Sequence, residues 1–199
     1  MKTKIEYFST LYTQNDDPWG YEHRWYEERK RNICLSVLLK PMYEHVLEIG
    51  CSNGVFSQHL ALRSTHLLCL DGHEAAVDLA RARLSSFRNV DVLQALVPDE
   101  FPLQKFDLIV IGEVLYYLNV DELMQLIEKL RNALTDDGMI LCCHWRYPIE
   151  HFSLNGDMVH QVFKDNILLY HYLSLKDPDF MIDLWTKDTQ SVANREGLV

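Results

Sequence analysis

The sequence predicts an α/β fold with a central, mostly parallel sheet of seven strands, a terminal antiparallel hairpin and helices on both faces. Short apolar runs alternate with helical patterns between residues 45 and 144. That alternation is typical of βαβ units, whose crossovers keep the strands parallel. The last two apolar runs are separated only by residues 176–179. A link this short is too short for a parallel crossover and predicts an antiparallel hairpin.

The elements can be justified in order along the chain. A helix is expected over 21–39, where Tyr26, Ile33 and Val37 recur at helical spacing and Pro41 ends the pattern. Asn119 and Glu122 form a capping box for a later helix. Strands are expected at 45–50, 66–71, 90–93, 106–112, 139–144, 167–175 and 180–186. Further helices are expected at 55–62, at 74–85, from the Asn119 cap through residue 134, and at 157–164.

Composition places the chain among ordinary globular proteins. Its 199 residues include 48% hydrophobic residues, and the formal net charge is −10. An acidic surface repels phosphate backbones, so we expect no nucleic-acid partner. The basic run Arg29-Lys30-Arg31 is flanked by Glu27 and Glu28, and this pattern is interpreted as a solvated helix face.

The sequence also carries signals about location. It has no apolar segment typical of a signal peptide or long enough to span a bilayer. The five cysteines are odd in number and lack metal-ligand spacing. Cys142 and Cys143 are adjacent in an expected strand and should point to opposite faces. We therefore expect a cytoplasmic protein with no membrane partner and no metal.

The stretch VLEIGCSNG, residues 46–54, is the most informative part of the chain. It leaves a strand, turns and enters a helix, and Gly50 and Gly54 allow a ligand close to the backbone. Asp71 stands at the tip of the next strand, where a carboxylate can accept hydrogen bonds from ribose hydroxyls. The pattern is neither G-x-G-x-x-G nor a P-loop. Glu48 would repel phosphate but suits a ligand with ammonium and sulfonium groups.

This stretch resembles motif I of class I S-adenosylmethionine (SAM)-dependent methyltransferases, with Ser52 in place of the middle glycine. The resemblance implies a Rossmann-like class I methyltransferase fold, and SAM as the cofactor with S-adenosylhomocysteine as its product. It also implies that Glu48 and Gly50 serve the methionine end, that Asp71 serves the ribose, and that Glu113 lies beneath the methionine. The cofactor-binding residues expected on this basis are Glu48, Gly50, Cys51, Gly54, Asp71, Gly72, Ala95, Leu96, Glu113, Trp19 and Tyr26.

Other segments resemble NodS-like methyltransferases. They are DPWGYE from residue 17, YEERK from residue 26, EVLYYL from residue 113, HWRYP from residue 144 and GDMVH from residue 156. The resemblance extends from about residue 17 to residue 185. It implies N-methylation, which in the named family acts on a deacetylated glucosamine of a chito-oligosaccharide.

Methyl transfer from SAM is an in-line displacement that needs alignment in a dry pocket and no metal. Glu113, Tyr117 and His144 follow expected strands and are the candidate catalytic residues. Candidates for binding the acceptor are Tyr116, Trp145, Arg146, Asp157 and His160. Structural alternatives remain open for these side chains, since the tyrosines could only pack a helix end and Arg146 could form an ion pair.

Three functional hypotheses follow. The first is methylation of a small polar amine, for example an amino sugar. The second is O-methylation of a hydroxyl or carboxylate, with Arg146 as a clamp, and the third is a non-catalytic SAM-binding domain. The expected organisation is a lid or helical segment over 1–40, a SAM-binding domain over 41–187 and a flexible tail over 188–199. A homodimer stays open.

Overall fold

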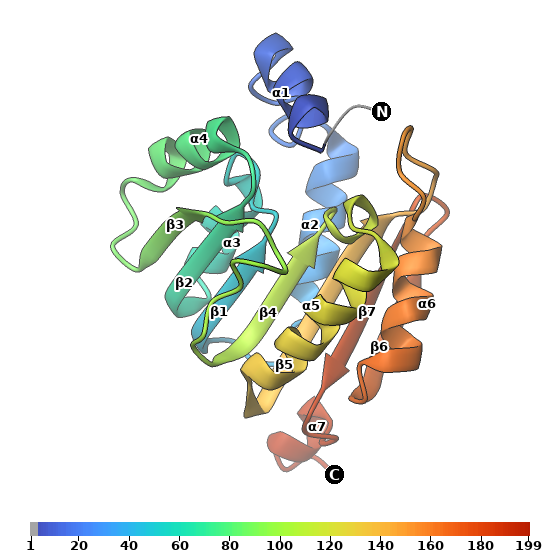
Figure 1. Cartoon of the computed structure of the whole chain (residues 1–199). Coiled ribbons are helices and arrows are strands. Elements are labelled where there is room, and N and C mark those ends of the chain that lie inside the picture. The colour runs from blue at the N-terminus through green and yellow to red at the C-terminus, as the bar shows by residue number, and fades with distance from the viewer. Residues whose placement is uncertain (1–3) are drawn as a thin grey trace.

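The computed structural model describes residues 4–199 and contains the expected sheet (Figure 1). Its strand order is β3-β2-β1-β4-β5-β7-β6. The first five strands in this order pair in parallel, while β7 pairs antiparallel with both β5 and β6. The predicted fold class is therefore confirmed, including the terminal hairpin. The strands are β1 (Tyr43–Ile49), β2 (Ser64–Asp71), β3 (Val90–Gln94), β4 (Phe106–Gly112), β5 (Leu134–Trp145), β6 (Tyr170–Lys176) and β7 (Phe180–Thr186).

Helices cover the sheet on both faces. They are α1 (Lys4–Gln14), α2 (Trp25–Ser36), α3 (Val55–Ala61), α4 (Glu74–Leu84), the 3₁₀ helix η1 (Leu115–Tyr117), α5 (Val120–Ala133), α6 (Gly156–Asn166) and α7 (Val192–Arg195). The side chains of α5, α6 and η1 share one apolar core with the sheet, and those of α2, α3 and α4 share the other. Among the described residues, no helix is long and apolar enough to cross a membrane.

The central strand β4 is apolar except for Asp107, whose carboxylate accepts hydrogen bonds from the backbone N–H groups of Glu44 and His45. Ile109 and Ile111 enter the core beneath α5, whereas Leu108 and Val110 enter the core on the opposite face. A strand with helices on both sides has no solvent face, so it needs no alternation of polar residues. The apolar run over residues 108–111 predicted this strand for the same reason.

The amino-terminal helix α1 was not predicted as a separate element, although a lid or helical segment was expected over 1–40, of which residues 1–3 lie outside the described residues. Helix α1 lies over the carboxyl edge of the sheet (Figure 1). Its Phe8 and Tyr12 lie four positions apart and therefore share a face. Because that face covers a cavity and not the sheet, its apolar pattern is short and mostly aromatic.

Two smaller differences concern the second half of the chain. Strand β5 begins at Leu134 and not at the expected residue 139, since Leu134 pairs with Phe106 before a register shift in β4. The last residues, expected to be a flexible tail, contain α7. Its amino terminus is capped by Ser191, whose side chain accepts a hydrogen bond from the backbone N–H of Asn194.

Candidate active site

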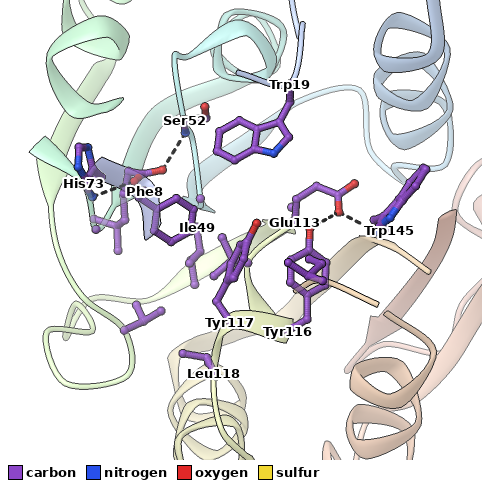
Figure 2. A pocket seen from close by; sticks show the side chains of 18 of the residues that line it. Phe8, Trp19, Ile49, Ser52, His73, Glu113, Tyr116, Tyr117, Leu118 and Trp145 are labelled. Carbon is purple, nitrogen blue, oxygen red and sulfur yellow. Dashed lines mark hydrogen bonds between the residues drawn. The ribbon is translucent and has the colours of Figure 1, made fainter. Parts of the chain in front are cut away.

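A cavity of about 790 Å³ opens at the carboxyl edge of the sheet. Its wall is built from the ends of β1 to β5, from α1 and α2, and from η1 with the residues around it. Figure 2 shows Ser52 and His73 on one side and Glu113, Tyr116 and Trp145 on the other. This edge is where open parallel sheets bind nucleotide-like ligands.

The turn after β1 contains three left-handed residues, Gly50, Ser52 and Gly54. Gly50 has φ +85°, and a Cβ there would lie 2.1 Å from Val114 Cγ2 and 2.8 Å from the carbonyl oxygen of Gly112. A side chain at this position would therefore collide with the loop after β4. Ser52 has φ 48°, so it keeps the left-handed conformation that a glycine would supply. The motif's departure from glycine leaves the turn intact.

Asp71 is the last residue of β2 and faces the cavity. Its Oδ2 accepts a hydrogen bond from the backbone N–H of Ser52 at 2.9 Å, and its Oδ1 accepts one from the N–H of His73 at 3.0 Å. Burial raises the pKa of Asp71, while these two backbone hydrogen bonds partly oppose the rise. Each carboxylate oxygen keeps acceptor capacity for a further donor, so the side chain can take both hydroxyls of a ribose.

Helix α1 is attached directly to this corner of the cavity. The Tyr12 hydroxyl lies 2.8 Å from Ser52 Oγ, and the Tyr12 ring stacks on His73 with centroids 5.1 Å apart. Ser9 Oγ lies 3.1 Å from His73 Nε2. Farther along the cavity, Phe8 packs edge-on against Tyr117 at 4.8 Å. The helix thus covers the cavity through contacts with three separate loops.

A buried charge cluster joins α2 to the end of β4. Lys30 Nζ lies 2.6 Å from Glu113 Oε1 and 3.0 Å from Glu27 Oε2. Lys30 and Glu27 are each only 6% exposed. Burial alone would lower the pKa of Lys30, but Glu113 and Glu27 hold it well above its usual value. The interpretation of residues 29–31 as a solvated face was therefore wrong for Lys30, which lines the cavity.

Glu113 is the centre of this cluster. It adopts φ 56°, a conformation that is strained for a residue with a side chain and that is concentrated at functional sites. Its Oε2 accepts hydrogen bonds from the Tyr116 hydroxyl and from the backbone N–H of Trp145, both at 2.7 Å. With Lys30 on Oε1, the carboxylate has three donors. It is fixed in place as an oriented negative charge.

Most of the predicted site residues line this cavity. They come from every segment that the sequence singled out before residue 146, and the structure brings them together although they are spread over more than a hundred positions. The members are Trp19, Tyr26, Gly50, Asp71, Gly72, Ala95, Leu96, Glu113, Tyr116, Tyr117 and Trp145.

Comparisons with known proteins agree with this geometry. A family model described as a methyltransferase domain matches residues 47–140. A crystal structure of a candidate methyltransferase from Pseudomonas syringae is 39% identical, has a TM-score of 0.74, and covers 82% of this chain and 99% of its own. The chain belongs to the class I SAM-dependent methyltransferases.

Nodulation protein S is among its relatives. The protein from Rhizobium tropici is 32% identical over 130 residues, which are 63% of this chain and 54% of that protein, so the chain spans about half the length of this curated relative. The crystal structure of the N-methyltransferase NodS from Bradyrhizobium japonicum WM9, in complex with S-adenosylhomocysteine, is 20% identical. It has a TM-score of 0.83 over 93% of this chain and 98% of its own, which shows a shared fold.

Three residues of the motif, Glu48, Cys51 and Gly54, lie outside the wall of the large cavity. Glu48 is 3% exposed, and its Oε2 accepts a hydrogen bond from Ser57 Oγ at 2.5 Å. Together with Cys51 it lines a smaller cavity of about 60 Å³, which adjoins the large one because both are lined by Gly50, Ser52 and Glu113. At Gly54 a Cβ would lie 3.1 Å from Ala80 Cα, so this glycine permits close packing of α3 on α4.

Four other candidate residues, Arg146, Asp157, His144 and His160, also lie outside the cavity wall. Arg146 is bound by Asp157, with Nε–Oδ1 at 2.7 Å and Nη2–Oδ2 at 3.0 Å, and neither side chain lines the cavity. His144 and His160 are 0% and 2% exposed and bond to each other inside the core. Side chains alternate along β5, so Trp145 faces α2 and the cavity while His144 points toward α6.

Sequence reasoning missed Lys30, Glu27 and the α1 residues Phe8 and Tyr12. Glu27 and Lys30 are three positions apart on a helix, a spacing that is equally common on exposed helix faces. Only the approach of Glu113, 83 positions away in the chain, distinguishes the two situations. The aromatic content of residues 7–12 was the one available signal for a segment covering the cavity.

Proposed function

We propose that this methyltransferase transfers the methyl group of SAM to the amine of a small polar acceptor. The observation that carries the proposal is the acidic wall of the cavity, where six carboxylates outnumber two basic side chains. SAM carries a positive charge on its sulfonium, and a protonated amine carries one on its nitrogen. A negatively charged cavity wall raises the local concentration of both. The carboxylates are Glu27, Asp71, Asp99, Glu113, Glu122 and Asp179, and the basic residues are Arg24 and Lys30.

The wall suits a sulfonium nucleoside at several points. Asp71 would hold the ribose, and Gly72, Ala95 and Leu96 would surround the adenine. Lys30 offers a cation for the carboxylate of the methionine moiety. Tyr26 Oη and His73 Nδ1 are buried in this wall with no hydrogen-bond partner among the described residues, and a polar ligand would satisfy them. When bound, SAM supplies a methyl group activated by its sulfonium.

The aromatic side chains of the wall favour the same assignment. Nine of them line the cavity, and their ring faces can stabilise a cationic ligand. Burial raises the pKa of Tyr116 well above its usual value, so its hydroxyl stays protonated and keeps donating to Glu113. Glu113 and Tyr116 would orient the acceptor nitrogen, and Tyr117 would complete the pocket. The rings are Tyr7, Phe8, Tyr12, Trp19, Tyr21, Tyr26, Tyr116, Tyr117 and Trp145.

Oxygen acceptors are less well served. A clamp for an anionic acceptor was expected from Arg146, but both of its terminal nitrogens are used by Asp157 and by the backbone carbonyls of Asp177 and Pro178. The relative from B. japonicum is described as an N-methyltransferase, which supports nitrogen over oxygen.

A paired-substrate assay tests the proposal. The purified protein with SAM should methylate glucosamine or a short amino-sugar oligomer, and it should not methylate the matched N-acetylated sugar, whose nitrogen is no longer nucleophilic. S-adenosylhomocysteine binding, measured by calorimetry, reports on the cofactor site independently. Methylation of hydroxyl or carboxylate compounds alone would overturn the amine assignment, and absence of cofactor binding would overturn the whole proposal.

The proposal extends to the surroundings of the protein. The net charge of −10 supports a small-molecule acceptor and opposes a nucleic-acid partner. Five free, buried cysteines support a reducing cytoplasmic location.

A further inference from the structure

A chain of polar side chains crosses the core behind η1, outside the cavity wall. His171 Nε2 lies 2.7 Å from Asp183 Oδ1, and Asp183 Oδ2 lies 2.5 Å from His160 Nδ1. His160 Nε2 lies 2.9 Å from His144 Nδ1, and His144 Nε2 lies 3.3 Å from the backbone nitrogen of Leu115. The three inner side chains are at most 3% exposed. Apolar residues would fill this space at no desolvation cost. A row of buried polar side chains at this place therefore calls for a functional or structural explanation.

The positions of the protons follow from the amide of Leu115, which can only donate. His144 Nε2 must therefore accept, so the His144 ring is neutral and carries its proton on Nδ1. That proton is donated to His160 Nε2, and the proton on His160 Nδ1 is donated to Asp183. Burial, with a smaller contribution from the charge of Lys30, lowers the pKa of His144 well below its usual value, which agrees with a neutral ring.

The far end of this chain holds the segment that faces the cavity. Leu115 is the first residue of η1, and the next residue, Tyr116, packs its ring edge-on against His144 at 5.5 Å. The Tyr116 hydroxyl donates to Glu113, and Tyr117 lines the cavity. His144 therefore contacts both the backbone and a side chain of η1, and any shift of its ring moves the wall beside Glu113.

We propose that Asp183, His160 and His144 are positioning residues for methyl transfer. They hold η1 so that Tyr116 and Glu113 keep the orientation that aligns the acceptor. In-line displacement depends strongly on alignment, and a displacement of about 1 Å can cost about a hundredfold in rate. The inference rests on the proposed function for its kinetic test but not for its structural test.

Two substitutions at His144 separate positioning from simple stability. In His144→Gln the longer amide can still accept from the N–H of Leu115, whereas in His144→Asn the shorter amide reaches only His160. Both leave one buried partner unsatisfied and should lose similar stability. We expect kcat to fall about tenfold or more in His144→Asn and to stay within about threefold in His144→Gln, with S-adenosylhomocysteine affinity unchanged in both.

Ser64→Ala is the matched control. Ser64 Oγ donates a buried hydrogen bond to the carbonyl oxygen of Leu60 near the amino end of β2, away from the cavity, so its loss should lower stability without changing kcat. Equal kcat in the two His144 variants, at equal folded fraction, would overturn the positioning role.

Hydrogen exchange at the amide of Leu115 gives a readout that needs no turnover. We expect faster exchange in His144→Asn than in His144→Gln, since only the latter keeps an acceptor for this N–H. If the wild-type protein binds S-adenosylhomocysteine but methylates no acceptor, the proposed function fails while this comparison still decides the structural claim. Equal exchange rates in the two variants would show that Asp183, His160 and His144 do not hold η1 in place.

Discussion

At the scale of single residues, Asp71 is the best test of the cofactor site. Asp71→Asn removes the charge and one acceptor, while the N–H groups of Ser52 and His73 still compete for the remaining oxygen. We expect S-adenosylhomocysteine to bind about tenfold to a hundredfold more weakly, which is the range for a charge-assisted hydrogen bond. Calorimetry measures this directly. Asp91→Asn, an exposed change on the adjacent strand, should leave the affinity unchanged, and an equal loss there would point to a general effect of charge.

Lys30 provides a second test, because its assigned partner is one part of the cofactor. Lys30→Met should weaken the binding of S-adenosylhomocysteine by about tenfold or more. It should leave the affinity for 5′-methylthioadenosine nearly unchanged, since that ligand lacks the amino-acid moiety. The same change leaves Glu27 and Glu113 without their cation and should destabilise the fold by about 3 kcal/mol or more.

The ligand pair is therefore compared by calorimetry below the melting temperature of the variant. Arg29→Met is the control, because Arg29 pairs with Asp177 and does not line the cavity. If Lys30→Met weakened the binding of both ligands equally, Lys30 would not be the partner of the methionine carboxylate.

At the scale of elements, α1 determines how the cavity closes. Tyr12→Ala removes the contact with Ser52 and the stacking on His73 but removes neither of the backbone hydrogen bonds to Asp71. We expect S-adenosylhomocysteine to dissociate about fivefold to tenfold faster, as expected for the loss of about 1 kcal/mol of contact. Stopped-flow dissociation measures the rate. Thr10→Ala, whose hydroxyl bonds only within α1, should have no effect, and an unchanged rate in Tyr12→Ala would show that α1 is no barrier.

The elements also show why some predictions succeeded. Strand β4 was predicted from its own residues, because burial on both faces favours a nearly continuous apolar run. Strands β1 and β2 carry shorter apolar runs. A lid or helical segment was expected over 1–40, but the bounds of helix α1 were not predicted, because its partner is the cavity and not the sheet. Its few aromatic residues have meaning only when Tyr117 and His73 are known to lie opposite.

At the scale of the whole molecule, Glu48 links stability to pH. Burial raises its pKa to about 7, above the value near 4.3 of an unfolded glutamate. The folded state therefore binds the proton more tightly, and the stability from this group is present below about pH 4 and is lost as pH rises through about 7. In Glu48→Gln, which can still accept from Ser57, this loss should disappear.

Urea denaturation at pH 5 and pH 8 measures the effect. From pH 5 to pH 8, the free energy of unfolding of Glu48→Gln should rise by up to about 3 kcal/mol relative to that of the wild type. Glu44→Gln, an exposed change on the same strand, should run parallel to wild type. A pH-independent difference for Glu48→Gln would mean that Glu48 is ionised in the folded protein as easily as in the unfolded chain.

The sequence by itself determined the order of strands and helices, the glycine turn at Gly50 and the carboxylate at Asp71. These features depend on neighbouring positions in the chain, through apolar runs, backbone freedom and the end of a strand. Only the tertiary structure decided which polar side chains reach the cavity. Lys30 enters it because Glu113 stabilises its burial, and His144 turns away because His160 and Leu115 satisfy its ring. A charged or polar group takes its place from partners far away in sequence, since burial without them costs too much free energy.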